Sequence, residues 1–308
     1  GGTLLLCTPL IHTTELVNGL VIGKMCWFHL AMLFFSVCVF FVMLTKKGTV
    51  IAFTFSDPLV LFFAGGVLIT YKWNLNPEPE KLIFAGQLVI LWFLLRYVLT
   101  AYREFKFFFL FVLMFTGLIE AVWGMQQLHG YSHSNHSLFR LTGSFFNPGP
   151  YSGYIAVILP VCLWTALRFQ KGMHYFGWVC AGAILIVLPA GMSRSAWMAA
   201  VVACGWVYWT ERIGWENTKA VCRRYKNATI PFIAIVAILV GCTIAGVYGM
   251  KQDSADGRLL MWKVTGKAIA GQPLAGTGLG GFPAAYAEAQ GEYFATGNGP
   301  GRVSGGVC

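Results

Sequence analysis

Two arginines in the second half of the sequence have the chemistry and the setting needed to bind phosphate. Arg194 lies in a short connector, Gly191 to Ser195, between two long apolar stretches, and Arg258 follows a later apolar stretch. A guanidinium group offers a planar fork of N–H donors that fits two phosphate oxygens at once. A charge held at a membrane boundary is costly, so the pair indicates a polyanionic lipid headgroup such as a pyrophosphate. Contact with ordinary phospholipid is the alternative.

Two further side chains, Trp262 and Lys263, follow Arg258 closely. A helix that starts near Asp256 places Arg258 and Trp262 on one face, because residues four apart are neighbours on a helix surface. We therefore expect these three residues to contact the ligand, with the arginine carrying the chemistry. A simple interfacial anchor is the alternative role for the tryptophan.

Two other patterns have the spacing of ligand sites but lack the necessary context. His129, His133 and His136 could hold a metal by spacing, yet no carboxylate or cysteine nearby completes a ligand set, so we expect a polar loop and no metal. The Gly-x-Gly-x-x-Gly pattern over residues 276–281 resembles a dinucleotide fingerprint, which requires a preceding strand. Because it follows an apolar stretch instead, we expect tight turns and no cofactor.

The elements that position these residues are set by an apolar composition. Of the 308 residues, 57% are hydrophobic and only 11% are charged. A soluble domain carries roughly 25% charged residues. Apolar runs approach twenty residues, which is the length needed to cross a hydrocarbon core of roughly 30 Å. The sequence therefore predicts a multi-pass membrane protein, and its net charge of +10 reflects orientation in the membrane and not nucleic-acid binding.

The apolar runs predict an all-α fold, a polytopic transmembrane helical bundle, because lipid cannot satisfy an open sheet edge. We expect eight spans, at residues 25–44, 50–71, 82–101, 107–128, 151–167, 174–192, 195–209 and 230–249. Residues 1–249 then form the transmembrane domain. Residues 250–308 form part of a large extracytoplasmic, periplasmic loop.

Basic residues decide between the two possible orientations. If the segment before residue 25 faces outward, eleven arginines and lysines lie in cytoplasmic connectors and four lie in outer ones. The positive-inside rule favours this arrangement. The four outer residues are Lys72, Lys81, Arg140 and Arg194. Arg194 and everything after residue 249 therefore lie on the outer face.

Three ionisable residues fall inside the predicted spans, where such residues are functional candidates by default. Asp57 and Arg96 are level within roughly 3 Å along the membrane normal, given a rise of about 1.5 Å per residue, and we expect them to pair. Glu120 lies nearer the outer face. Arg96 reaching the inner headgroups by itself is the alternative.

Several segments together resemble the O-antigen ligase and polymerase family of bacterial envelope glycosyltransferases. The matching segments are Gly143–Tyr154, Ser193–Ser195, Gly257–Lys263 and Pro273–Phe282. The resemblance extends over roughly residues 140 to 295, and the earlier spans are similar only in hydropathy.

The resemblance implies a metal-independent, cofactor-free glycosyltransferase of the bacterial inner (cytoplasmic) membrane, surrounded by membrane lipids. Its donor would be an undecaprenyl-diphosphate-linked glycan, and its acceptor lipid A core, a growing polysaccharide or a protein. By resemblance, Arg194 and Arg258 hold the donor pyrophosphate and act as the catalytic pair. Preorganised cations at a dry membrane boundary would stabilise the charge on the departing pyrophosphate.

One departure from the family pattern affects the expected activity. The family carries a histidine farther along the outer loop as general base, and no histidine follows His174 in this chain. We therefore expect a form truncated at both ends that is inactive alone. Two other functional classes remain open: a multi-pass transporter or lipid-glycan flippase, which predicts repeated halves with broken helices, and a non-enzymatic membrane scaffold.

Overall fold

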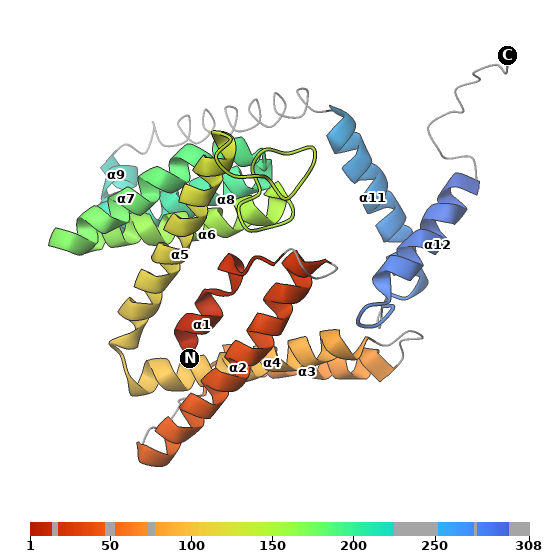
Figure 1. The fold of residues 1–308 in the computed structure, drawn as a ribbon, viewed down its shortest axis with the longest axis horizontal. Helices are drawn as coiled ribbons and strands as arrows, with labels where there is room; N and C mark the ends of the chain where they lie inside the picture. The colour runs from red at the N-terminus through yellow and green to blue at the C-terminus, as the bar shows by residue number, and fades with distance from the viewer. Residues whose placement is uncertain (14–17, 47–52, 73–77, 225–251, 274–275, 296–308) are drawn as a thin grey trace. The chain divides into compact units, whose positions relative to one another are not determined.

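The computed structural model describes residues 1–13, 18–46, 53–72, 78–224, 252–273 and 276–295 (Figure 1). Every regular element within these ranges is a helix, so the predicted all-α fold is confirmed. The chain divides into two compact units, one of residues 1–51 and 93–224 and the other of residues 52–92 and 225–308. The division into a membrane domain at 1–249 and an outer segment at 250–308 stays a prediction.

Five helices in the described part of the chain are long and apolar enough to cross a membrane. They are α2 (Gly19–Thr45), α4 (Pro79–Ala101), α5 (Phe105–Leu128), α6 (Pro148–Arg168) and α7 (Lys171–Val187) with its 3-10 extension to Gly191. Each coincides with a predicted span. The chain is a multi-pass membrane protein.

The predicted number of eight spans is not established. Helix α3 (Ser56–Lys72) has 17 residues, and α8 (Arg194–Tyr208) has 15 before a π-helical turn at Trp209–Ile213. At about 1.5 Å per residue, α3 is shorter than the roughly 30 Å of a hydrocarbon core, and α8 approaches that length only together with the π-helical turn. The span predicted at 230–249 lies outside the described residues.

Helix α6 is the centre of the first unit, where it packs against α5, α7 and α8. Its inward face is fully buried at Ile155, Ile158 and Cys162. On α7, a Cβ added at Gly177 would lie 2.8 Å from backbone atoms of α6, so the two helices approach closely there. Small residues at such contacts let membrane helices pack backbone to backbone.

The start of α6 follows from its sequence. Asn147 is extended, and its side-chain Oδ1 accepts a hydrogen bond of 2.9 Å from the Gly149 N–H. Pro148 follows at the first helical position, where a missing N–H costs nothing. The Asn-Pro pair therefore forms the start of α6.

The helix ends of the first unit gather into two groups. In one group, Lys24 at the start of α2 contacts Ser144 just before α6, and Gly191 after α7 abuts Ser152 of α6. In the other group, the start of α5 meets the end of α6, where the Phe107 and Phe169 ring centroids are 5.5 Å apart. Connectors that the sequence places on opposite faces therefore lie at opposite ends, whereas the orientation in the membrane stays a prediction.

The second unit contains α3, the first part of α4, α11 (Gln252–Gly271) and α12 (Phe282–Ala295). Within it, Asp57 is fully buried and accepts hydrogen bonds from the Thr54 N–H at 2.7 Å and the Trp92 indole N–H at 3.0 Å. The predicted Asp57–Arg96 pair crosses the division between the units and stays a prediction.

Candidate functional site

Arg194 is the first residue of α8, directly after a tightly turned connector. The 3-10 turn Pro189–Gly191 leads into Met192, whose φ of 51° is left-handed. Ser193 then occupies the N-cap position of α8, without a side-chain capping hydrogen bond. The Arg194 side chain is half-buried. A helix start presents free backbone N–H groups and a positive dipole, so Arg194 adds a full charge where an anion is already favoured.

Packing against neighbouring helices holds this connector in place. A Cβ at Gly191 would collide with the Ser152 hydroxyl of α6, so a larger residue there would force the Ser152 side chain to move. The Trp197 indole N–H reaches back from α8 and donates to the Leu188 carbonyl at 2.8 Å. Ala196 is buried one turn into α8. Because both ends of the connector are fixed, the position of Arg194 is defined by the helix packing.

The other three predicted binding residues lie on α11. Arg258, Trp262 and Lys263 are exposed, and Trp262 retains 70% of its surface, while the neighbouring Val264 is fully buried. The helix predicted from Asp256 is confirmed, although it begins four residues earlier, at Gln252. The structure describes α11 within the second unit and Arg194 within the first, so their pairing stays a prediction.

The glycine pattern at 276–281 forms the turn between α11 and α12. Gly276, Gly278 and Gly280 have φ values of 62°, 77° and 93°, which L-residues with a Cβ rarely adopt. A Cβ at Gly280 would also lie 2.7 Å from the Glu78 Oε1 atom. The pattern follows a helix, and no strand occurs in the described ranges, so these glycines serve turns as expected.

The segment 142–145, which leads into α6, is held by a glutamine of α5. The Gln127 Oε1 atom accepts from the Thr142 N–H at 2.9 Å and from the Gly143 N–H at 2.7 Å. Its Nε2 group donates to the Gly143 carbonyl at 3.1 Å and to the His133 carbonyl at 3.1 Å. The buried Gln127 side chain thus supplies the hydrogen-bond partners that these backbone groups would otherwise find in a helix or sheet.

A buried carboxyl of α5 continues this support. Glu120 is fully buried, and its Oε2 atom accepts from the Ser144 N–H at 3.1 Å. The Tyr151 hydroxyl donates to the Glu120 carbonyl at 3.1 Å, and a Cβ at Gly143 would collide with both side chains. The close fit explains why glycine, with a φ of 55°, stands at that position.

A lysine from the first long helix completes the enclosure of the segment. The Lys24 Nζ group donates to the Ser144 carbonyl at 3.0 Å and to the Pro9 carbonyl at 2.6 Å, and it lies 3.9 Å from the Phe145 ring centroid. The Asn135 amide donates to the Phe145 carbonyl at 3.0 Å. The N-terminal segment, α2 and α5 therefore meet at the motif that precedes α6.

Sequence reasoning placed Glu120 near the outer face but did not find Lys24 or Gln127. Lys24 stands one residue before a predicted span, a position typical of lysines that contact headgroups. Its partner Ser144 is 120 positions away along the chain. For Gln127, the only signal in the sequence is that a polar residue stands at the end of an apolar run.

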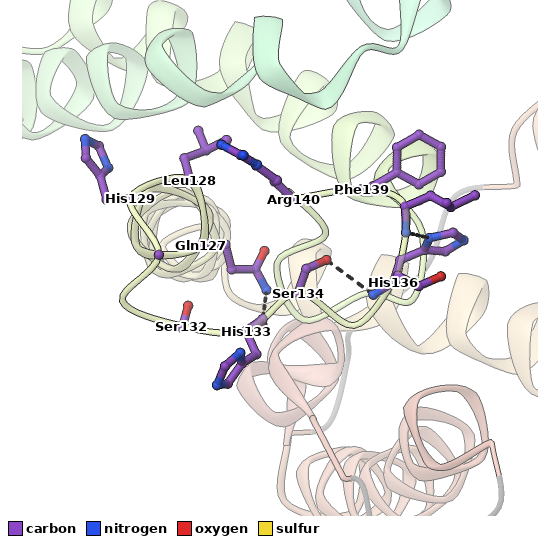
Figure 2. A pocket seen from close by; sticks show the side chains of 12 residues that line it. Gln127, Leu128, His129, Ser132, His133, Ser134, His136, Phe139 and Arg140 are labelled. Atoms are coloured by element: carbon purple, nitrogen blue, oxygen red, sulfur yellow. Dashed lines mark hydrogen bonds between the residues drawn. The ribbon is translucent and has the colours of Figure 1, made fainter.

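A cavity opens beside this support, at the end of α5 and along the loop that follows (Figure 2). Its volume is about 570 Å³, and the residues lining it lie between Gln127 and Arg140. All three histidines of the 129–136 pattern line it. No group of three or more histidine, cysteine or acidic side chains in the described ranges is arranged to hold a metal ion.

Comparison with known proteins identifies the second half of the chain. Residues 179–301 match the family model described as O-antigen ligase. This stretch of the chain is similar to O-antigen ligases. No curated protein and no solved structure matches it. The resemblance to the O-antigen ligase and polymerase family is therefore confirmed.

The O-antigen ligase match contains all four predicted site residues. It begins within α7, passes through the connector with Arg194, and includes α11 with Arg258, Trp262 and Lys263. The match does not reach the segment 142–145 or the cavity beside it. The segment and the cavity lie earlier in the chain, so only their own contacts bear on their role.

Proposed function

We propose that this protein, in its full-length form, transfers a glycan from an undecaprenyl-diphosphate donor to an acceptor at the outer face of the bacterial inner membrane. The O-antigen ligase match supports a membrane glycosyltransferase of the ligase or polymerase type. Lipid A core, a growing polysaccharide and a protein hydroxyl are the acceptor classes. In this proposal, residues 1–249 form the transmembrane domain, and residues 250–308 belong to the extracytoplasmic part.

The observation that carries the proposal is the setting of Arg194. It combines a permanent positive charge, a helix start and a connector fixed by Gly191 and Trp197. Departure of a lipid pyrophosphate builds negative charge, and preorganised donors at a water-poor boundary stabilise such charge strongly. The donor sugar is already activated by its pyrophosphate, so transfer needs no nucleotide.

Residues of α11 supply the second half of the proposed site. Arg258 would contribute a second guanidinium fork for pyrophosphate oxygens, and Lys263 a further positive charge. Exposure of Trp262 leaves its ring available to the lipid boundary or to a sugar. Arg258 and Trp262 lie four residues apart on α11, so one ligand could contact both.

Conservative substitutions of the two arginines test the function. Arg194→Lys and Arg258→Lys keep the charge but lose the bidentate fork, and each should reduce glycan transfer by about 100-fold or more. The measurement is attachment of glycan in cells whose own gene for this protein is deleted and replaced by the variant gene. Normal transfer in both variants would refute the pyrophosphate role.

The matched control is Arg103→Lys, at an exposed arginine between α4 and α5. It should transfer glycan normally, because Arg103 belongs to the predicted cytoplasmic connectors. Immunoblots of the membrane fraction must show equal amounts of all three variants, so that loss of transfer reports chemistry and not insertion.

A further inference from the structure

The cavity beside segment 142–145 has the chemistry of a site for an anion. Among the described residues that line it, Arg140 is the one charged side chain, and none of them is acidic. Arg140 is exposed and therefore available to a ligand. The other polar lining residues are serines, histidines and one glutamine, whose groups include many hydrogen-bond donors. A lining of donors around one guanidinium favours carboxylate or phosphate oxygens.

One polar group of the lining is set to donate to a ligand, and a second has no partner. The His136 Nδ1 atom accepts from the Leu138 N–H at 3.0 Å, so in the neutral ring the proton is on Nε2. The Ser132 Oγ atom is buried and has no hydrogen-bond partner among the described residues. Because this atom is buried, a ligand in the cavity does not reach it unless the Ser132 side chain turns.

The loop that forms the cavity is held in shape without a ligand. The Ser134 hydroxyl accepts from the His136 N–H at 3.2 Å and contacts the Thr142 hydroxyl at 3.3 Å. The Gln127 amide donates to the His133 carbonyl at 3.1 Å (Figure 2). Because these bonds already order the loop, little conformational entropy is lost when a ligand enters.

Apolar side chains also line the cavity. The Phe139 and His136 rings lie 4.8 Å apart, centroid to centroid, and Leu138 is 82% exposed. Small-molecule sites combine such a surface with a few placed polar groups. A sugar ring has an apolar face and a hydroxyl edge, and it therefore fits this combination better than a bare inorganic anion does.

We propose that this cavity binds an anionic sugar, one that carries a phosphate or a carboxylate. Arg140 pairs with the acidic group, the serines and His136 bond the hydroxyls, and the Phe139 side contacts the sugar ring. Its use in glycan transfer, as a subsite for a charged sugar of donor or acceptor, rests on the function proposed above. Binding by itself does not depend on that function.

Histidine footprinting of the purified full chain in detergent tests the binding. Diethyl pyrocarbonate modifies accessible imidazoles, and mass spectrometry measures the rate at His133 and His136. Glucose 1-phosphate and glucuronate should each slow this modification several-fold, whereas glucose at equal concentration should not. Absence of protection by both anionic sugars would overturn the proposal. Equal protection by inorganic phosphate would reduce the cavity to a plain anion site and also overturn it.

Two variants locate the effect. Arg140→Gln should weaken protection about tenfold or more, since a charge-assisted bond is lost. In the matched control Arg103→Gln, also at an exposed arginine, the anionic sugars should slow histidine modification as much as in the parent protein. Unchanged protection in Arg140→Gln would refute the assignment. Arg194→Lys separates the two proposals: it should lose glycan transfer but keep protection, so either result can fail without the other.

Discussion

At the scale of single residues, side chains replace secondary structure around segment 142–145. Gln127, Glu120 and Lys24 satisfy consecutive backbone groups there, at distances between 2.7 and 3.1 Å. Buried backbone groups need such partners, because water is absent to supply them. The arrangement makes the shape of the motif before α6 depend on α5 and α2.

Replacing Gln127 with leucine should destabilise the protein markedly. The variant leaves the buried Thr142 and Gly143 N–H groups without acceptors, which costs about 2 kcal/mol or more. Thermal unfolding in detergent, followed by a thiol-reactive dye, measures the change, because Cys162 and Cys180 are buried in the folded state. Gln126→Leu, at the exposed neighbouring position, is the control and should leave the midpoint nearly unchanged. Equal midpoints for both variants would contradict the role of Gln127.

At the scale of helices, α6 organises the first unit through close approaches to its neighbours. Gly177 of α7 faces backbone atoms of Cys162 and Ala166 on α6, and Gly191 faces Ser152. Lipid chains are as apolar as leucine, so tight packing, and not burial from water, holds such helices together. The second contact also fixes the connector that carries Arg194.

A pair of glycine substitutions on α7 separates packing from helix propensity. Gly177→Ala introduces a Cβ 2.8 Å from α6 backbone and should cost about 1–3 kcal/mol through overpacking. Gly182→Ala, on the same helix with nothing within 4 Å of the added Cβ, should be neutral or slightly stabilising. The same dye assay reports both. A Gly177→Ala protein as stable as the Gly182→Ala protein would show that α6 and α7 do not pack this closely.

At the scale of the whole molecule, the two groups of helix ends in the first unit agree with connectors that alternate between the two faces of the membrane. The group that contains Lys24, Ser144 and Gly191 corresponds to the predicted outer face. The group that contains Phe107, Phe169 and Glu211 corresponds to the predicted inner face; the Glu211 Oε1 atom accepts from the indole N–H of Trp164 at 3.1 Å. The positive-inside rule then assigns the group of helix ends with more arginine and lysine in its connectors to the cytoplasmic face.

Cysteine labelling of intact cells tests this assignment. Ser195→Cys, exposed beside Arg194, should react with a membrane-impermeant maleimide added outside, once the outer membrane is made permeable. Gln170→Cys, exposed in the connector between α6 and α7, should react only after the cells are lysed. The parent protein, with its own cysteines, sets the background. The reverse pattern would invert the topology and place Arg194 in the cytoplasm.

The sequence by itself determined the helical class, the membrane location, the five long spans and the similarity to O-antigen ligases. These features depend on local properties, because an apolar run of sufficient length must be helical in lipid. The predicted site residues Arg194 and Arg258 also came from sequence, through motifs with a chemical reason. The count of eight spans stays a prediction, because α3 and α8 are shorter than the five long helices and residues 230–249 lie outside the described part of the chain.

Only the tertiary structure decided how the motif before α6 is held and where a cavity opens beside it. Lys24 and Ser144 meet across 120 positions, and Gln127 serves backbone groups 15 and 16 residues away. Such contacts depend on which helices pack together and at what height. Helix packing is decided by side-chain shape at many positions at once, and no single pattern in the sequence records it.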